Sequence, residues 1–248
     1  MARKGTGKTI ENAQDKLTPG ATHAKSLYRT FIDAIVDQRL LPGTRLNELA
    51  MSKLFDVSRR EMGHLFTRLE CEGLVVSIQN RGAFVASPDA QEARAIFGAR
   101  KSIEAGIVEL AATRASGADF KVLEKSIADE DALRRAGRMR EAIKESGRFH
   151  LLLADIAGNA ILADLVKQLV ARTSLVTSLY DNASGMSCWH DDHGKLIGHL
   201  RARRTKRAID IMRQHLDDLE ASLDLSVKIG SKADLRTIFG LPSEQPKK

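Results

Sequence analysis

Apolar residues recur at helical spacing in the first third of the chain. The first such segment predicts an amphipathic helix from about Thr22 to Gln38, which ends before the turn signal Pro42-Gly43. Its apolar face consists of Leu27, Phe31, Ala34 and Ile35. A shorter helix is predicted in ELAMSKLF, with Asn47 as its N-cap. Asp56 follows it and tolerates the left-handed turn conformation, so a turn separates this helix from the next.

The third predicted helix begins in the stretch VSRREMGHLFTRLECEGLV. Ser58, followed three residues later by Glu61, forms a capping box. The buried face is predicted to consist of Met62, Leu65, Phe66 and Leu69. Arg59 and Arg60 fall in the first turn, where the helix dipole repels cations unless an anion lies opposite. On this pattern alone, the arginines form either a solvated basic face or a surface that meets a polyanion.

Two short segments after this helix have strand character. LVVSI and AFVAS are joined by residues 79–82, QNRG, which is a hairpin signal. Three helices followed by a hairpin is the element order of a winged helix-turn-helix. Within such a motif the start of the last helix meets the major groove of DNA, where phosphates offset the cost of the paired arginines.

The strand-like residues end at Ser87-Pro88-Asp89, a turn and helix-start signal. Proline is absent between Pro88 and Pro242, and helical apolar spacing continues through this stretch, which predicts a bundle of about six helices. The expected fold is therefore mostly α, a winged helix-turn-helix followed by an all-α helical bundle. The expected parts are a flexible basic tail (1–20), the DNA-binding domain (21–88), the helical domain (89–225) and a carboxy-terminal tail (226–248).

Composition favours a protein of the cytoplasm with a polyanionic partner. The 248 residues are 43% hydrophobic, yet no run of eighteen apolar residues occurs and the amino terminus lacks the apolar core of a signal peptide. Cys71 and Cys188 are too few for a disulfide framework and are expected to be reduced thiols. The net charge is +7, and residues 1–88 carry 13 Lys or Arg against 9 Asp or Glu.

Residues 28–86 resemble the GntR family of transcriptional regulators, with PGTRL, VSR, RLECEGLV and RGAFV at the family's relative positions. The resemblance places recognition arginines at Arg59 and Arg60 and the wing at Arg81 and Gly82. The chain departs from the family at Arg60-Glu61, where Thr-Pro is usual, and at Gly63, where a second recognition arginine is usual. The residues expected to contact DNA are Arg45, Ser58, Arg59, Arg60, His64, Arg81 and Gly82.

The helical part resembles the FCD ligand-binding domain of the FadR-like branch of that family, in ARKSIEAGIVELAA, RFHLLLADIAGNAIL and DDHGKLIGHLRARRTKRAIDIMRQHL. The resemblance implies a divalent metal such as zinc or nickel, held by His150, His193 and His215. The last two are 22 residues apart, as is typical of the pair. An aspartate usually lies four residues before the first histidine, but this chain has Ser146 there. The alternative is a polar pocket in which the histidines hydrogen-bond a ligand or water.

The same resemblance implies a small carboxylate effector. Arg100 matches an arginine that often faces it, because a guanidinium can bind a carboxylate through two parallel hydrogen bonds. The alternative for Arg100 is a surface salt bridge to Glu104, one turn on. Asn159 is also assigned to the effector-binding region, although its place at a helix start favours a capping role.

These features together predict a homodimeric regulator that binds a palindromic operator, is controlled by an organic acid, does not span a membrane and catalyses no reaction. A metal-dependent hydrolytic enzyme with a three-histidine site is the main alternative, but no HExxH motif supplies its general base. A helical interaction module with an incidental basic face is a second alternative, and it leaves the capping-box and wing arginines unexplained.

Overall fold

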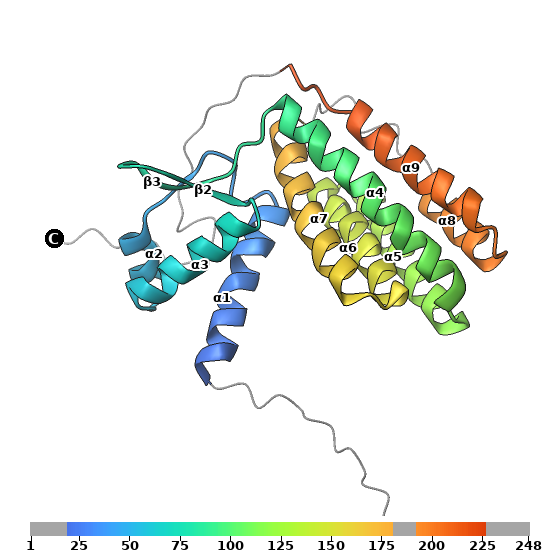
Figure 1. Cartoon of the computed structure of the whole chain (residues 1–248), viewed down its shortest axis with the longest axis horizontal. Helices are drawn as coiled ribbons and strands as arrows, with labels where there is room; N and C mark the ends of the chain where they lie inside the picture. The colour runs from blue at the N-terminus through green and yellow to red at the C-terminus, as the bar shows by residue number, and fades with distance from the viewer. Residues whose placement is uncertain (1–18, 181–191, 227–248) are drawn as a thin grey trace, which may run out of the picture.

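The computed structural model describes residues 19–180 and 192–226 of the chain (Figure 1). The two predicted tails lie outside these residues, apart from residues 19, 20 and 226. Figure 1 shows a small α/β unit on one side and a helical bundle on the other, which is the predicted fold class. Within the described residues, no helix combines the length and the apolar composition that crossing a membrane requires.

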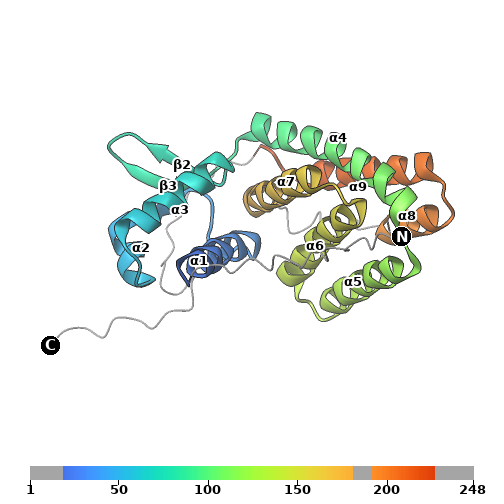
Figure 2. The same cartoon turned by 60° about the horizontal axis from the view of Figure 1, so that its bottom comes forward.

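The amino-terminal unit is a winged helix-turn-helix. Its helices and strands are α1 (Pro19–Val36), β1 (Arg45–Leu46), α2 (Glu48–Leu54), α3 (Arg59–Cys71), β2 (Val75–Ile78) and β3 (Gly82–Val85). The strands form an antiparallel sheet in the order β1-β3-β2. The predicted hairpin is confirmed, whereas β1 was not predicted because two residues carry no strand periodicity. Figure 2 shows the hairpin projecting away from the bundle.

The predicted caps account for how these short helices begin and end. The Asn47 side chain accepts a hydrogen bond from the Ala50 amide, and Asp56 has the left-handed φ of 52°. Gln38 also has a positive φ, 53°, which ends α1 two residues before the predicted position. The core of the unit is completed from outside it, because Ala171 and Leu175 pack into the same apolar cluster as Phe31 and Leu69.

The remaining helices form the predicted six-helix bundle within the described residues. They are α4 (Ala90–Arg114), α5 (Gly117–Arg135), α6 (Met139–Ala157), α7 (Ala160–Tyr180), α8 (Asp192–Arg201) and α9 (Thr205–Ala221). Asp89 caps α4 by accepting a hydrogen bond from the Glu92 amide at 2.8 Å. Fully buried side chains such as Phe149 and Leu153 of α6 form the centre, and each stabilises the fold by about 1.5–3 kcal/mol through the area it removes from water.

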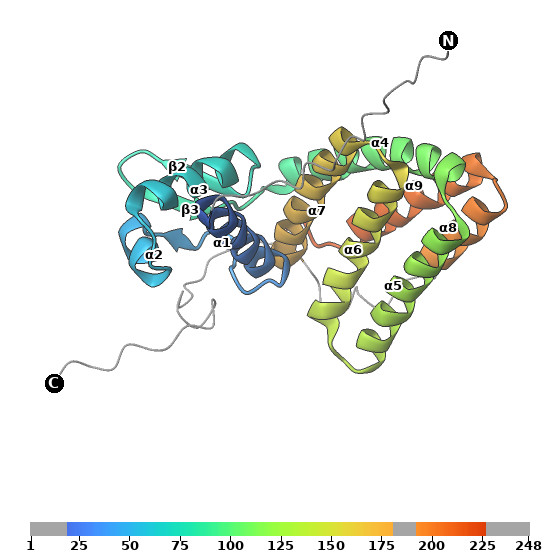
Figure 3. The ribbon, with the colours of Figure 1, turned by 90° about the horizontal axis from the view of Figure 1, so that it is seen from below.

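Helix α7 connects the two parts. It packs against α4 and α6 within the bundle and against α1 of the winged helix-turn-helix. Figure 3 shows α1 lying beside α7 from below, in agreement with these contacts. One helix therefore contributes to both cores.

Candidate nucleic-acid interface and candidate metal centre

The first turn of α3 is fixed by its capping box. Ser58 Oγ accepts a hydrogen bond from the Glu61 amide at 3.1 Å, and Glu61 Oε2 accepts one from the Ser58 amide at 2.9 Å. This reciprocal arrangement satisfies two of the amides that a helix start leaves unpaired. It also holds Arg59 and Arg60 in the first turn, where both side chains are exposed.

The other predicted DNA-contact residues lie around α3 and the hairpin. His64 is exposed on α3, and Arg81 is exposed in the turn between β2 and β3. Gly82 follows with a φ of 93°, a conformation that favours glycine, although no atom lies within 4 Å of where its Cβ would be. Arg45 is exposed in β1 opposite Phe84.

A cleft of about 590 Å³ runs between α3, β1 and the wing. Of the seven predicted residues, Arg45, Arg59 and Gly82 line it. The cleft also contains a carboxylate, since Glu48 Oε1 lies 3.6 Å from Arg59 Nε. This face therefore combines exposed cations with hydrogen-bond donors and acceptors, which is the chemistry that base edges and phosphates require.

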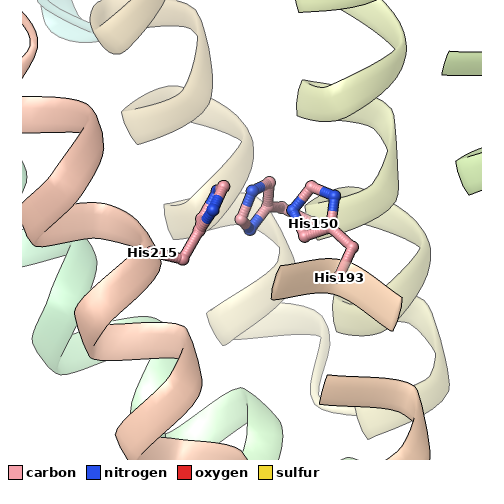
Figure 4. A group of neighbouring side chains, drawn as sticks. All are labelled: His150, His193 and His215. Carbon is pink, nitrogen blue, oxygen red and sulfur yellow. The ribbon is translucent and has the colours of Figure 1, made fainter. Parts of the chain in front are cut away.

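The bundle brings together the three predicted histidines. His150 comes from α6, His193 from α8 and His215 from α9, and all three are buried. One ligand nitrogen from each ring lies within 4.8 Å of the other two, and Figure 4 shows the rings gathered at one point. Residues that are distant in sequence are thus assembled at the spacing of a metal site.

Each imidazole also faces a carboxylate through its Nδ1 atom. His150 Nδ1 lies 2.5 Å from Glu104 Oε2, and His193 Nδ1 lies 3.4 Å from Glu130 Oε2. His215 Nδ1 lies 3.8 Å from Asp192 Oδ2. Metal-bound histidines commonly donate their second N–H to a carboxylate, which orients the ring and strengthens the ligand. This arrangement leaves the Nε2 atoms for a metal.

The pKa values of His150 and His215 suit metal binding. Burial lowers the pKa of His150 to about 3, and burial with the neighbouring His193 lowers the pKa of His215. Burial would raise the pKa of Glu104, but Arg100 and His150 bring it down to about 2. Neutral imidazoles beside ionised carboxylates are the form in which histidine binds a metal.

The residues present fit a divalent ion. His193 Nε2 and His215 Nε2 are buried and have no hydrogen-bond partner among the described residues, which is costly unless something else binds them. Three nitrogen ligands with one open position are typical of zinc sites that accept a further ligand. Ser146 lies buried one turn before His150 and supplies a hydroxyl in place of a carboxylate.

The histidine cluster borders a cavity of about 40 Å³. Its polar lining consists of Arg100, Ser146, His150, Thr173, Ser174, Thr177, His215 and Ser222. Arg100 lines the cavity, and its Nε donates to Glu104 Oε1 at 2.5 Å. The salt bridge is buried, so the expectation of a surface pair is corrected.

The known proteins to which the chain is similar are transcriptional regulators. The chain is 24% identical over 211 residues to the HTH-type transcriptional repressor RspR of Escherichia coli (strain K12), covering 85% of this chain and 92% of RspR. It is 29% identical over 154 residues to YdhC, an uncharacterized HTH-type transcriptional regulator of Bacillus subtilis (strain 168), covering 62% and 67%. The structure of a putative transcriptional regulator GntR from Rhodococcus sp. RHA1 has a TM-score of 0.70 at 23% identity, covering 81% of this chain and 96% of that one.

The family profile of the FCD domain matches residues 95–218, half of the 248-residue chain. The chain belongs to the GntR family of transcriptional regulators. The match runs from α4 to α9 and includes all three histidines. A GntR regulator of this kind binds DNA and is not an enzyme, so a three-histidine hydrolase is not favoured.

One predicted effector residue of this GntR regulator lies elsewhere. Asn159 does not line the cavity, and its Oδ1 accepts hydrogen bonds from the Ile161 and Leu162 amides at 3.2 and 3.3 Å. It is the N-cap of α7, and its side chain is occupied in satisfying the helix start. The assignment of Asn159 to effector binding is therefore corrected to capping. Cys71 is a free, exposed thiol, and Cys188 lies outside the described residues.

Sequence reasoning missed the carboxylates that support the histidines. Glu130 lies on α5 and shares no short spacing with His193, so no local pattern connects the two. Asp192 directly precedes His193 in the sequence but faces His215 on another helix. This contact cannot be read from the sequence, because it depends on how α8 and α9 pack. Glu104 was considered only as a partner of Arg100, but its second carboxylate oxygen also contacts His150 Nδ1.

Proposed function

We propose that this GntR regulator binds a small organic acid in the cavity beside a three-histidine metal centre, and that the ligand changes its affinity for operator DNA. The winged helix-turn-helix would place α3 in the major groove, with the predicted residues of α3, β1 and the wing as its DNA contacts. The metal would supply a positive charge and an open coordination position for the acid. His150, His193 and His215 would hold it.

Arg100 supports a carboxylate as the ligand. Its Nε is bound to Glu104, which leaves the two terminal nitrogens of the guanidinium for a partner in the cavity it lines. The parallel N–H donors of a guanidinium match the two oxygens of a carboxylate. The hydroxyls of Thr173 and Thr177 already donate to backbone carbonyls, so they are available to the ligand as acceptors. An acid that carries its own hydroxyl groups suits such a lining.

The observation that carries the control mechanism is the double role of α7. Its cavity side presents Thr173, Ser174 and Thr177, while Ala171 and Leu175 of the same helix belong to the core of the winged helix-turn-helix. A shift of α7 on ligand binding would therefore move apolar contacts of the DNA-binding unit directly. Packed cores transmit such shifts because they are close-packed and resist compression.

A polar contact continues this route to α3. The ring of Tyr28, on α1, lies beside two cations. Arg68 Cζ is 3.5 Å from the ring centroid, and Lys167 Nζ of α7 is 5.5 Å from it. The Tyr28 hydroxyl donates to Glu72 Oε2 at 2.6 Å, at the end of α3. The recognition helix is thus connected through one aromatic ring to the helix that lines the cavity.

The test is a thermal-shift screen of small carboxylic acids, such as lactate, malate and citrate, with zinc present. A ligand that binds the folded state alone raises the melting temperature with its concentration. Arg100→Lys is the informative variant, because it keeps the charge beside Glu104 and removes the forked donor. We expect Arg100→Lys to abolish the shift while operator affinity without acid stays near the wild-type value. A shift of equal size in Arg100→Lys would exclude Arg100 as the anchor.

We also propose that the regulator acts as a homodimer on a palindromic operator, because paired half-sites reflect two-fold protein symmetry. The start of α7 exposes Ile161 to 73% and Leu165 to 39%, a candidate contact between copies. Replacing both by glutamate should yield monomers in light scattering and weaken binding to the full operator. Val122→Glu, at an exposed apolar residue of α5, is the matched control and should remain dimeric. Dimers of unchanged affinity in the double variant would exclude this surface.

A further inference from the structure

The cleft beside α3 contains an acidic residue where a phosphate-binding surface would ordinarily avoid one. Glu48, the first residue of α2, is 42% exposed, and Arg59 opposite it is 67% exposed. The two side chains meet through Glu48 Oε1 and Arg59 Nε, 3.6 Å apart. Contact through Nε leaves the two terminal nitrogens of Arg59 without a partner among the described residues, so they can point toward DNA.

The second oxygen of Glu48 is open because residue 63 is glycine. A Cβ at Gly63 would lie 3.7 Å from Glu48 Oε2, so a longer side chain there would cover that atom. Glycine inside a helix costs about 0.5–1 kcal/mol relative to alanine, and the backbone of Gly63 in α3 does not require glycine, so this cost is not explained by the fold. Within the described residues Oε2 has no hydrogen-bond donor, and it remains an acceptor that faces the cleft.

Stability alone does not account for this placement. A carboxylate in the first turn of α2 complements the helix dipole wherever its side chain points. An exposed ion pair such as Glu48–Arg59 contributes little to folding. Negative charge also repels the phosphates of any DNA that enters the cleft. A hydrogen bond that the carboxylate accepts from the DNA itself would offset this unfavourable term.

We propose that Glu48 and Arg59 together read one G·C base pair in each half-site. Arg59 donates from its terminal nitrogens to guanine O6 and N7, and Glu48 Oε2 accepts from the N4 amino group of the paired cytosine. In the major groove these atoms lie side by side on one base pair, as the guanidinium and the carboxylate do in the cleft. The inference rests on the proposed placement of α3 in the major groove and names a determinant of specificity.

The test begins with an operator selected from random DNA and a panel of its single base-pair substitutions, measured at fixed salt. For the wild-type chain, replacing one G·C pair per half-site should weaken binding by about 5- to 150-fold. Glu48→Gln should reduce that preference by about threefold or more without abolishing it and leave the other positions unchanged, because the hydrogen bond to cytosine N4 is weakened while Arg59 still reads the guanine. It should also raise affinity for non-specific DNA, since one negative charge is removed.

Two further variants separate base reading from a change of fold. Glu70 lines the same cleft, but its oxygens accept hydrogen bonds from the Ser77 amide and hydroxyl, at 3.1 and 2.9 Å. Glu70→Gln should therefore keep the wild-type preference at every position. Gly63→Arg should cover Glu48 Oε2 with a cation and weaken the preference at the same G·C pair as Glu48→Gln does.

The outcomes distinguish this inference from the proposed function. An unchanged preference profile in Glu48→Gln overturns the inference, as does loss of the preference in Glu70→Gln. If Arg59→Ala leaves operator affinity unchanged, α3 does not read DNA and the proposed function itself fails. If Arg59→Ala weakens binding while Glu48→Gln keeps the G·C preference, only the reading of cytosine by Glu48 is wrong.

Discussion

The two parts of the chain handle charge in opposite ways. On the winged helix-turn-helix, Arg45, Arg60 and Arg81 are exposed to solvent. In the bundle, Arg100 and Glu104 are almost fully buried, and each is paired. An exposed cation without a partner costs the fold little free energy because water solvates it, whereas a buried charge must be compensated within the fold. The first arrangement suits a polyanion that comes from outside, and the second suits a small ligand that must be enclosed.

The difference also determines what each part tolerates. A surface arginine can be removed with little effect on folding, because it lies outside the apolar core. Arg100 and His150 both contact the Glu104 carboxylate, so removing one of these three side chains would leave a buried polar or charged group without its partner. Variants at Arg100 and Glu104 therefore require conservative replacements, whereas variants at the exposed arginines of α3 do not.

The largest expected effect is on metal content. The double substitution His193→Ala with His215→Ala should reduce bound metal from about one ion per chain to none in elemental analysis, because it removes two of three ligands. Operator affinity measured without acid should stay near that of the wild type. Metal retained at full stoichiometry in the double variant would place the ion elsewhere. Ser146→Asp should act in the opposite direction and bind metal more tightly, since it adds an anionic ligand one turn from His150.

Arg59→Ala should give the next largest effect, a loss of roughly 1–3 kcal/mol in operator binding by fluorescence anisotropy, if the side chain reads a base. The melting temperature should change little. Arg29→Ala, an exposed arginine of α1 outside α3 and the wing, is the control and should leave operator affinity almost unchanged. Equal losses in both variants would indicate a general charge effect and no specific contact.

Glu130→Gln tests the carboxylate that supports His193. Metal affinity should fall about 10- to 100-fold in a competition titration with a chelator, because this carboxylate orients the imidazole. Glu124→Gln on the same helix removes an exposed partner of Arg201 and should have no such effect. An unchanged metal affinity in Glu130→Gln would mean that His193 is positioned by packing alone.

The smallest expected effect concerns Asn159. Asn159→Ala should lower the free energy of unfolding by about 1 kcal/mol through loss of the α7 cap and leave the response to carboxylic acids intact. Asn159→Asp keeps an accepting oxygen and should restore most of the stability. A lost acid response with unchanged stability would return Asn159 to the effector site.

The sequence predicted the winged helix-turn-helix in more detail than the bundle site, and the reason is physical. Ser58, Glu61, Asn47 and Asp56 act on neighbours within a few residues, so their spacing reveals what they do. The two-residue strand β1 was missed because it is held by its partner β3 and carries no pattern of its own.

The bundle site depends on contacts between helices. The three histidines were found through resemblance to a known domain, and their convergence requires α6, α8 and α9 to pack together. No spacing in the sequence predicts the contacts of Glu130 with His193 and of Asp192 with His215, because tertiary packing brings their helices together. Asn159 shows the reverse case, because its place at a helix start already favoured the capping role that its hydrogen bonds show.

The central claim is that the buried site controls the exposed one. Its most direct test is the operator affinity of the zinc-loaded protein, measured with and without the acid that gives the largest thermal shift, in the wild type and in His193→Ala with His215→Ala. We expect the acid to change the wild-type affinity by at least about fivefold, the lower end of typical allosteric coupling, and to leave the double variant unchanged. An equal change in both proteins, or no change in either, would contradict control through the histidine site.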